Sequence, residues 1–135
     1  MNTLSDRLAR LLLVLWAGSL WSLALWTAPL LFKLAPDRHA AGVIAAGLFR
    51  AETFLTVALA FVCLWRHGRQ KFRLLYLAAV LLLINEFLIN RLLDYVRVSG
   101  EVLGLGFGGW HGASAVLYLV ACAAALLIVW NDDFR

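Results

Sequence analysis

The hydrophobic positions of this chain form four long runs separated by short polar segments. The runs extend over residues 8–34, 40–65, 73–94 and 110–130. Each provides roughly the 20 residues that an α-helix needs to cross the hydrocarbon core of a bilayer. A helix also satisfies its own backbone hydrogen bonds, as lipid requires. The pattern predicts an all-α membrane protein, a four-transmembrane-helix bundle with antiparallel up-down topology, as a single domain over residues 1–135.

The second run is the least certain in outline. As one helix, residues 39–65 would be about 40 Å long, longer than the hydrocarbon core requires. We expect such a helix to tilt or to begin in the headgroup layer, and a break near Gly47 is the alternative. Residues 95–109 contain Gly100, Gly104, Gly106, Gly108 and Gly109. Glycine disfavours helix, so this segment is predicted to be a connector.

Composition supports a membrane protein and argues against a nucleic-acid partner. The chain is 64% hydrophobic and 15% charged, whereas soluble domains carry about 25% charged residues. Its formal charge of +4 comes from basic residues at helix ends and in the loop 66–73, where they oppose lipid headgroups. The predicted partner is the lipid bilayer, with a second copy of the chain or another membrane protein as a further partner.

Loop charge predicts the orientation. If both termini lie on the side of the loop 66–73, that side contains Arg7, Arg10, Arg66, Arg69, Lys71, Arg73 and Arg135, and the other contains Lys33, Arg38 and Arg97. Positive residues favour the cytoplasmic side. We expect a cell-membrane protein, in the inner membrane if bacterial, with both termini in the cytoplasm.

Polar residues interrupt three of the four runs at a similar depth. At 1.5 Å per residue Glu86 lies about 18 Å from Leu74, and Glu52 about 20 Å from Trp65. Charged side chains near the bilayer centre cost on the order of 2.5–3.5 kcal/mol, so they should face protein, water or one another. The predicted polar cluster consists of Arg50, Glu52, Glu86, Asn90, Arg91, Asp94, His111 and Ser114.

Helix geometry predicts the pairing inside this cluster. Helical side chains lean toward their own N-terminus, which carries Glu52 toward Arg91, and Arg50 toward Asp94 or the headgroups. Glu86 is then the carboxyl with the poorest pairing and the titratable group of the cluster. Arg50 and Glu52 lie about 200° apart around their helix, so they cannot both face the same neighbour.

Two interpretations of the cluster stay open, and a partner-binding face is a third. Either the cluster forms a cavity, open to the outer face, that binds a proton, ion or small molecule, or the cluster only holds the helices together. His111 is the only plausible intramembrane histidine ligand for haem or a metal ion, because His39 and His67 lie in loops; a hydrogen bond to a carboxylate such as Asp94 is favoured. No cofactor is predicted. No catalytic motif is present, so the chain is not predicted to be an enzyme.

Three short motifs resemble a known family. They are Ala28-Pro29-Leu30-Leu31-Phe32, Ala41-Gly42 through Gly47-Leu48-Phe49, and Trp110-His111-Gly112-Ala113-Ser114. They are similar to the small four-helix membrane proteins that include transmembrane protein 205. The resemblance implies a four-helix domain of uncharacterised function, distantly related to copper-resistance-type and haem-linked membrane proteins. It implies no catalytic residues and no role for His111.

Overall fold

The computed structural model describes residues 4–131, and this part of the chain is almost entirely helical. The elements are α1 (Leu4–Ser22), the π-helical turn η1 (Leu23–Thr27), α2 (Ala28–Leu34), α3 (Arg38–Lys71), α4 (Arg73–Ile84), the π-helical turn η2 (Asn85–Ile89), α5 (Asn90–Ser99) and α6 (Phe107–Trp130). They join into four helices long and apolar enough to cross a membrane, Leu4–Leu34, Arg38–Lys71, Arg73–Ser99 and Phe107–Trp130. The predictions of an all-α protein and of four membrane helices are confirmed.

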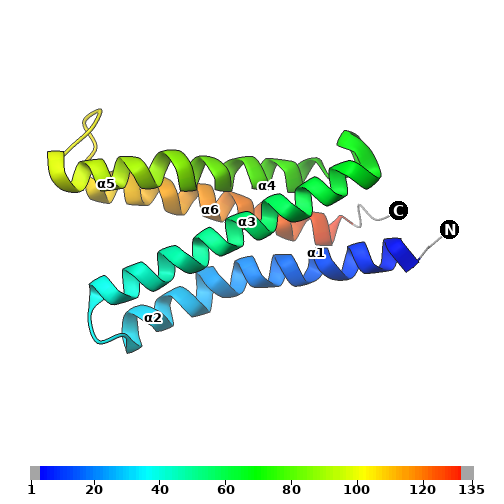
Figure 1. Cartoon of the computed structure of the whole chain (residues 1–135), viewed down its shortest axis with the longest axis horizontal. Helices are drawn as coiled ribbons and strands as arrows, with labels where there is room; N and C mark the ends of the chain where they lie inside the picture. Colours follow the sequence, from blue (N-terminus) through cyan, green and yellow to red (C-terminus); the bar gives the residue numbers. More distant parts are fainter. Residues whose placement is uncertain (1–3, 132–135) are drawn as a thin grey trace.

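The four helices lie side by side and are joined at alternate ends (Figure 1). The described residues nearest the two chain termini lie at one end, called here the terminal end. The α2–α3 and α5–α6 connections lie at the opposite end, called here the connection end. Within the bundle α4 packs along α6, α3 crosses α4, and α1 packs against α6. Toward the connection end the α2–α3 pair diverges from the α5–α6 pair.

Two boundaries differ from those expected from sequence. The third helix continues through Tyr95 to Ser99, so the predicted 95–109 connector is too long at both ends and only residues 100–106 join the helices. Val96 is buried there. Its packing stabilises helix over residues 95–99, which contain none of the glycines that follow. Gly100, with φ 92°, ends the helix in a conformation that favours glycine. The second helix stays helical at Gly47 and continues past its expected end at Trp65 to Lys71, so most of the expected loop 66–73 is helical; the chain departs from helical geometry at Gly68.

Each π-helical turn falls where a polar or proline residue interrupts an apolar helix. Pro29 has no backbone N–H to donate into the preceding turn, and just before it the Ala28 N–H reaches back five residues to the Leu23 carbonyl. In η2 the Asn90 N–H likewise reaches the Asn85 carbonyl. Such π-turns are frequent at functional sites, and η2 contains the buried Glu86.

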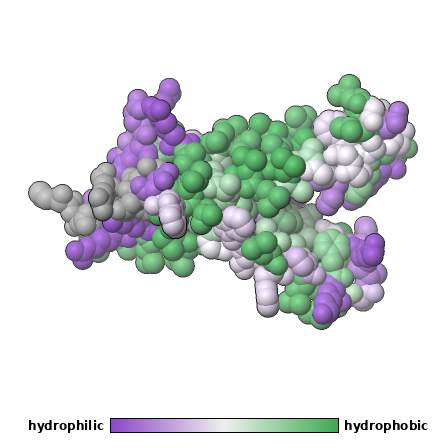
Figure 2. All heavy atoms as spheres, turned by 180° about the vertical axis from the view of Figure 1, so that it is seen from behind, coloured by the Kyte–Doolittle hydropathy of each residue, from purple (hydrophilic) through white to green (hydrophobic). Residues whose placement is uncertain are grey.

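The apolar core occupies the half of the bundle nearer the terminal end. Its fully buried members include Leu13, Leu20, Phe72, Leu75 and Ile128. Large apolar side chains also cover the outside, and Figure 2 shows them as a band between two more hydrophilic ends. Because water would disfavour such a surface and lipid would not, the chain is a multi-pass membrane protein.

The bundle is hollowed at the connection end. Figure 2 shows a cleft between the two diverging helix pairs, named here the connection-end cleft. The continuous apolar cluster contains no residue of α2, η2 or α5. The polar positions of α3 and η2 therefore lie where the apolar packing stops.

Candidate functional site

Glu86 is the centre of one polar group. Its carboxylate is held by two donors: Arg50 Nε lies 2.5 Å from Oε1, and Asn90 Nδ2 donates to Oε2 over 2.9 Å. The side chain of Glu86 is 7% exposed, whereas that of Arg50 is 63% exposed. Glu86 and Asn90 lie one helical turn apart, so both can engage the same carboxylate. This group joins α3 to the third helix.

Glu52 is the centre of a second polar group that joins α3 to α1. It is buried, and Ser19 Oγ lies 2.8 Å from its Oε1. The same hydroxyl lies 2.8 Å from the carbonyl oxygen of Trp16. A hydroxyl has one proton to donate, so Ser19 can serve only one of these two acceptors at a time.

A complete hydrogen-bond chain lies one turn further along the same interface. Trp16 Nε1 donates to Thr56 Oγ1 over 2.8 Å, and Thr56 Oγ1 donates to the backbone carbonyl of Glu52 over 2.8 Å. Thr56 is fully buried and Trp16 nearly so. The N–H of Trp16 and the O–H of Thr56 are thus both used in this chain. Neither can donate to the Glu52 carboxyl, whose donor is the shared hydroxyl of Ser19.

The predicted Glu52–Arg91 ion pair is wrong, and so is the prediction that Glu86 has the poorest pairing. Glu86 pairs with Arg50, and Glu52 bonds to Ser19. Arg91 is exposed and has no ion-pair partner among residues 4–131. The prediction that Arg50 and Glu52 face different neighbours agrees with the structure. The error was to direct Glu52 toward the third helix when α1 occupies that side of α3.

The remaining predicted residues lie nearer the connection end and do not join these groups. Arg97 Nη1 lies 3.7 Å from Asp94 Oδ1, with both side chains exposed. Arg97 also stacks over the ring of Phe107, 5.1 Å from its centroid. The ring of His111 also stacks on Phe107, with the two ring centroids 5.9 Å apart. The expected bond between His111 and a carboxylate such as Asp94 is replaced by this stacking, and Ser114 is half-buried on α6.

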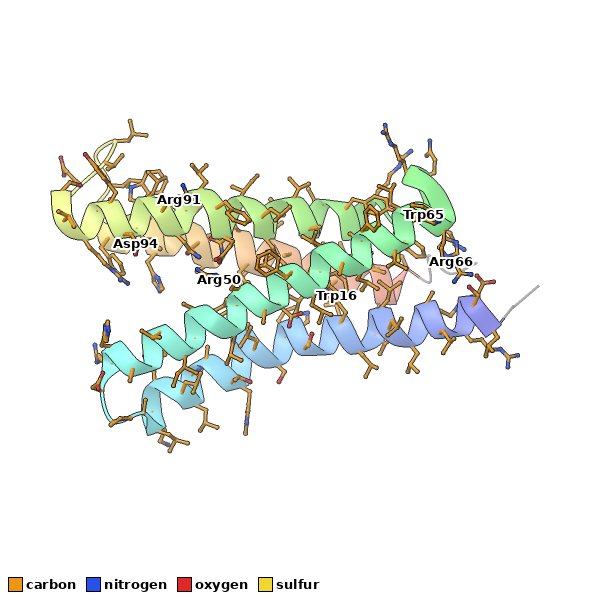
Figure 3. All side chains as sticks on the ribbon, viewed as in Figure 1. Trp16, Arg50, Trp65, Arg66, Arg91 and Asp94 are labelled. Atoms are coloured by element: carbon orange, nitrogen blue, oxygen red, sulfur yellow. The ribbon has the colours of Figure 1, made fainter. Side chains whose placement is uncertain are left out.

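Figure 3 shows how the labelled residues divide. Arg50 is directed from α3 toward the side of α5, and Arg91 lies on the edge of α5 farther from α3. Within residues 4–131, no three His, Cys, Asp or Glu side chains come together in a group that could hold a metal ion. Asn85, the residue before Glu86 in the chain, has a buried Oδ1 without a hydrogen-bond partner among the described atoms.

Comparison with protein families gives a match for this chain. Residues 11–101 match the family described as Domain of unknown function (DUF4149). The chain belongs to this family. Comparison with curated proteins and with solved structures gives no match. The DUF4149 match covers the first three membrane helices with both polar groups, and it ends before α6.

Sequence reasoning missed the α1 side of this DUF4149 domain. It did not include Ser19, Trp16 or Thr56, although Trp16 and Ser19 lie three residues apart and therefore share one face of α1. Glu52 and Thr56 share one face of α3 for the same reason. Matching those two stripes could have suggested the contact. The α1–α6 contact has its own anchors, since Tyr118 OH donates to the Leu20 carbonyl and Trp21 Nε1 to the Cys122 carbonyl.

Proposed function

We propose that this DUF4149 domain is a multi-pass membrane protein that binds a proton at Glu52, beside the Arg50–Glu86 ion pair. The observation that carries the proposal is the shared hydroxyl of Ser19, which lies 2.8 Å from both Glu52 Oε1 and the Trp16 carbonyl. With a proton on Glu52, the carboxyl donates to Ser19 Oγ, and Ser19 donates to the Trp16 carbonyl. Both the Ser19 hydroxyl and the Trp16 carbonyl then have a partner, and the carboxyl carries no charge.

Charge balance supports the same site. Glu86 has a fixed cation in Arg50, whereas Glu52 has no ion-pair partner among residues 4–131. A buried carboxylate without a counter-charge is costly in a membrane, so a mobile positive charge is needed to neutralise it. A proton is the smallest such charge and needs no cavity.

The connection-end cleft gives access to the Arg50–Glu86 pair, on the other face of α3 from Glu52. Arg50 is 63% exposed although it is 12 residues from the start of α3, about 18 Å along the helix. Its guanidinium has donors beyond the one used on Glu86, and these require water or another acceptor. We propose that water enters the cleft of Figure 2 as far as Arg50.

We further propose that both termini are cytoplasmic, in a cell membrane, so that the cleft opens outward. Four basic residues gather where α3 ends and α4 begins, at the terminal end (Figure 1), as the positive-inside rule requires: Arg66, Arg69, Lys71 and Arg73. Arg135, which contributed to the charge count, lies outside the described residues. The motifs similar to transmembrane protein 205 support a relationship to that family as well.

The proton is tested by infrared spectroscopy of the whole chain in lipid. We expect wild type to show the carbonyl stretching band of a protonated carboxyl at neutral pH. Glu52→Gln should abolish this band, and the control Glu101→Gln, at an exposed position in the connector, should retain it. A wild-type spectrum without the band, or a band that persists in Glu52→Gln, would contradict the proposal.

A second candidate is a purely structural role for the same residues. The observation in its favour is that the two polar groups tie α3 to α1 and to the third helix. Polar side chains between membrane helices stabilise packing in this way. A structural role predicts a stability loss for Glu52→Gln, whereas proton binding predicts that Gln, which can donate to Ser19 as a protonated carboxyl does, is tolerated.

A further inference from the structure

A turn rich in basic residues projects from the terminal end, away from both polar groups. It consists of the end of α3, which includes the break at Gly68, with the start of α4, and it contains Arg66, Arg69, Lys71 and Arg73. We name these four residues the basic turn. The side chains of Arg66, Arg69 and Arg73 are exposed, and that of Lys71 is half-buried. The start of α1 adds Arg7 and Arg10 at the same end.

The basic turn has a defined shape. Gly68, with φ 72°, adopts a conformation that favours glycine and breaks α3. Tyr76 OH donates to the Gly68 carbonyl over 2.9 Å and fixes the break to α4. Phe72 is 1% exposed and anchors the turn in the bundle. The four cations are therefore displayed from an ordered turn.

Two tryptophans set the depth of the turn. Trp65 is 81% exposed and Trp130 is 82% exposed, and exposed tryptophan rings favour the membrane interface. Figure 3 shows Trp65 and Arg66 at the same end of α3. The basic turn begins directly after Trp65, so it lies at the level of the lipid phosphates.

A shallow pocket separates the basic turn from the start of α1. Its lining consists of Asp6, Ala9, Arg10, His67, Lys71 and Phe72. Lys71 Nζ lies 5.7 Å from the centroid of Phe72, and the ring of His67 meets Phe72 edge-on. The lining thus contains two cations, Arg10 and Lys71, and one carboxylate, Asp6, beside the ring of Phe72.

We propose that the basic turn binds the phosphate of an anionic phospholipid at the membrane surface. Charge complementarity carries the proposal: among the described residues this end (Figure 1) contains six basic residues (Arg7, Arg10, Arg66, Arg69, Lys71, Arg73) against the carboxylate of Asp6. An anionic lipid offers a negative phosphate without the positive choline of phosphatidylcholine. The occupant is therefore a lipid of the phosphatidylglycerol class, and the site is independent of the proton proposed at Glu52.

The test compares lipid retention by the full chain. Protein is reconstituted in vesicles with equal amounts of phosphatidylglycerol and phosphatidylcholine, and co-purified lipid is counted by native mass spectrometry. Wild type should retain phosphatidylglycerol preferentially, on the order of fivefold for each basic side chain engaged. Raising the salt concentration should reduce this preference, because exposed charges are screened.

The variant with Arg66→Gln, Arg69→Gln, Lys71→Gln and Arg73→Gln should lose the preference. A matched control, Lys33→Gln with Arg38→Gln at the connection end, should keep it. If the four-fold variant does not fold, the variant with Arg66→Lys, Arg69→Lys and Arg73→Lys keeps the charge and should retain phosphatidylglycerol. Equal retention of the two lipids by wild type, or a preference lost in the control, would overturn the proposal. Displacement of the lipid by free glycerol phosphate would also overturn it.

Discussion

Arg50 reaches the buried carboxylate of Glu86 from an exposed position on α3. The two side chains are 63% and 7% exposed, and Arg50 Nε lies 2.5 Å from Glu86 Oε1. The pair is therefore asymmetric: the Arg50 side chain is largely exposed, and the Glu86 carboxylate depends on its partners. This asymmetry determines which substitution should harm the protein more.

We predict that Arg50→Gln destabilises the domain more than Glu86→Gln does. Removing the cation leaves a buried carboxylate unpaired, a change that typically costs about 3–5 kcal/mol. Removing the carboxylate leaves an exposed guanidinium that water can solvate, so we expect a loss on the order of 1.5–3 kcal/mol. Thermal unfolding in detergent measures the ranking. Equal losses would show that the two charges are equally costly to leave unpaired, and the reverse order would show that the guanidinium is the costlier of the two.

We predict that Glu52→Gln changes stability by less than about 1 kcal/mol. The Gln amide can donate to Ser19 Oγ as a protonated carboxyl would, and it carries no charge. Glu52→Leu should cost about 1–3 kcal/mol, because it leaves Ser19 Oγ with one partner fewer in a part-buried site. The same unfolding series measures both variants. A loss in Glu52→Gln as large as that in Arg50→Gln would show that Glu52 is an ionised, paired carboxylate.

We predict that Trp16 and Thr56 are coupled across the α1–α3 interface. Thr56→Val removes the acceptor of the buried indole N–H and should cost about 1–3 kcal/mol, and Trp16→Phe removes the donor. In the double variant the losses should not add, because both substitutions remove one hydrogen bond. A double-mutant cycle of unfolding free energies measures this coupling. Additive losses would mean that the bond contributes nothing in the membrane.

We predict that the residue at Ser99 is reached from outside the cell. Ser99 is exposed at the end of α5, next to the connection end. Ser99→Cys, in a background with Cys63 and Cys122 replaced, should react with a membrane-impermeant thiol reagent in intact cells. A cysteine at Gln70, exposed near the end of α3, is the matched control and should react only after lysis. The opposite pattern would invert the proposed orientation.

Sequence by itself determined the four membrane helices. Long apolar runs must become helices in lipid, because no other local structure satisfies their backbone groups. It also determined that Arg50 and Glu52 face different neighbours, since that angle is a property of one helix. The extension of the third helix to Ser99 was missed because residues 95–99 were grouped with the glycines that follow them, although the burial of Val96 supports helix there.

Only the tertiary structure decided which neighbours those side chains meet. Glu52 could have faced the third helix, but it meets Ser19 on α1, and Arg50 meets Glu86. These choices depend on how each helix is rotated and on where the two helix pairs diverge. A repeating apolar pattern constrains such rotation only weakly in a membrane, because lipid solvates apolar faces as well as a neighbouring helix does. Partner identity therefore comes from the packing of helices against one another.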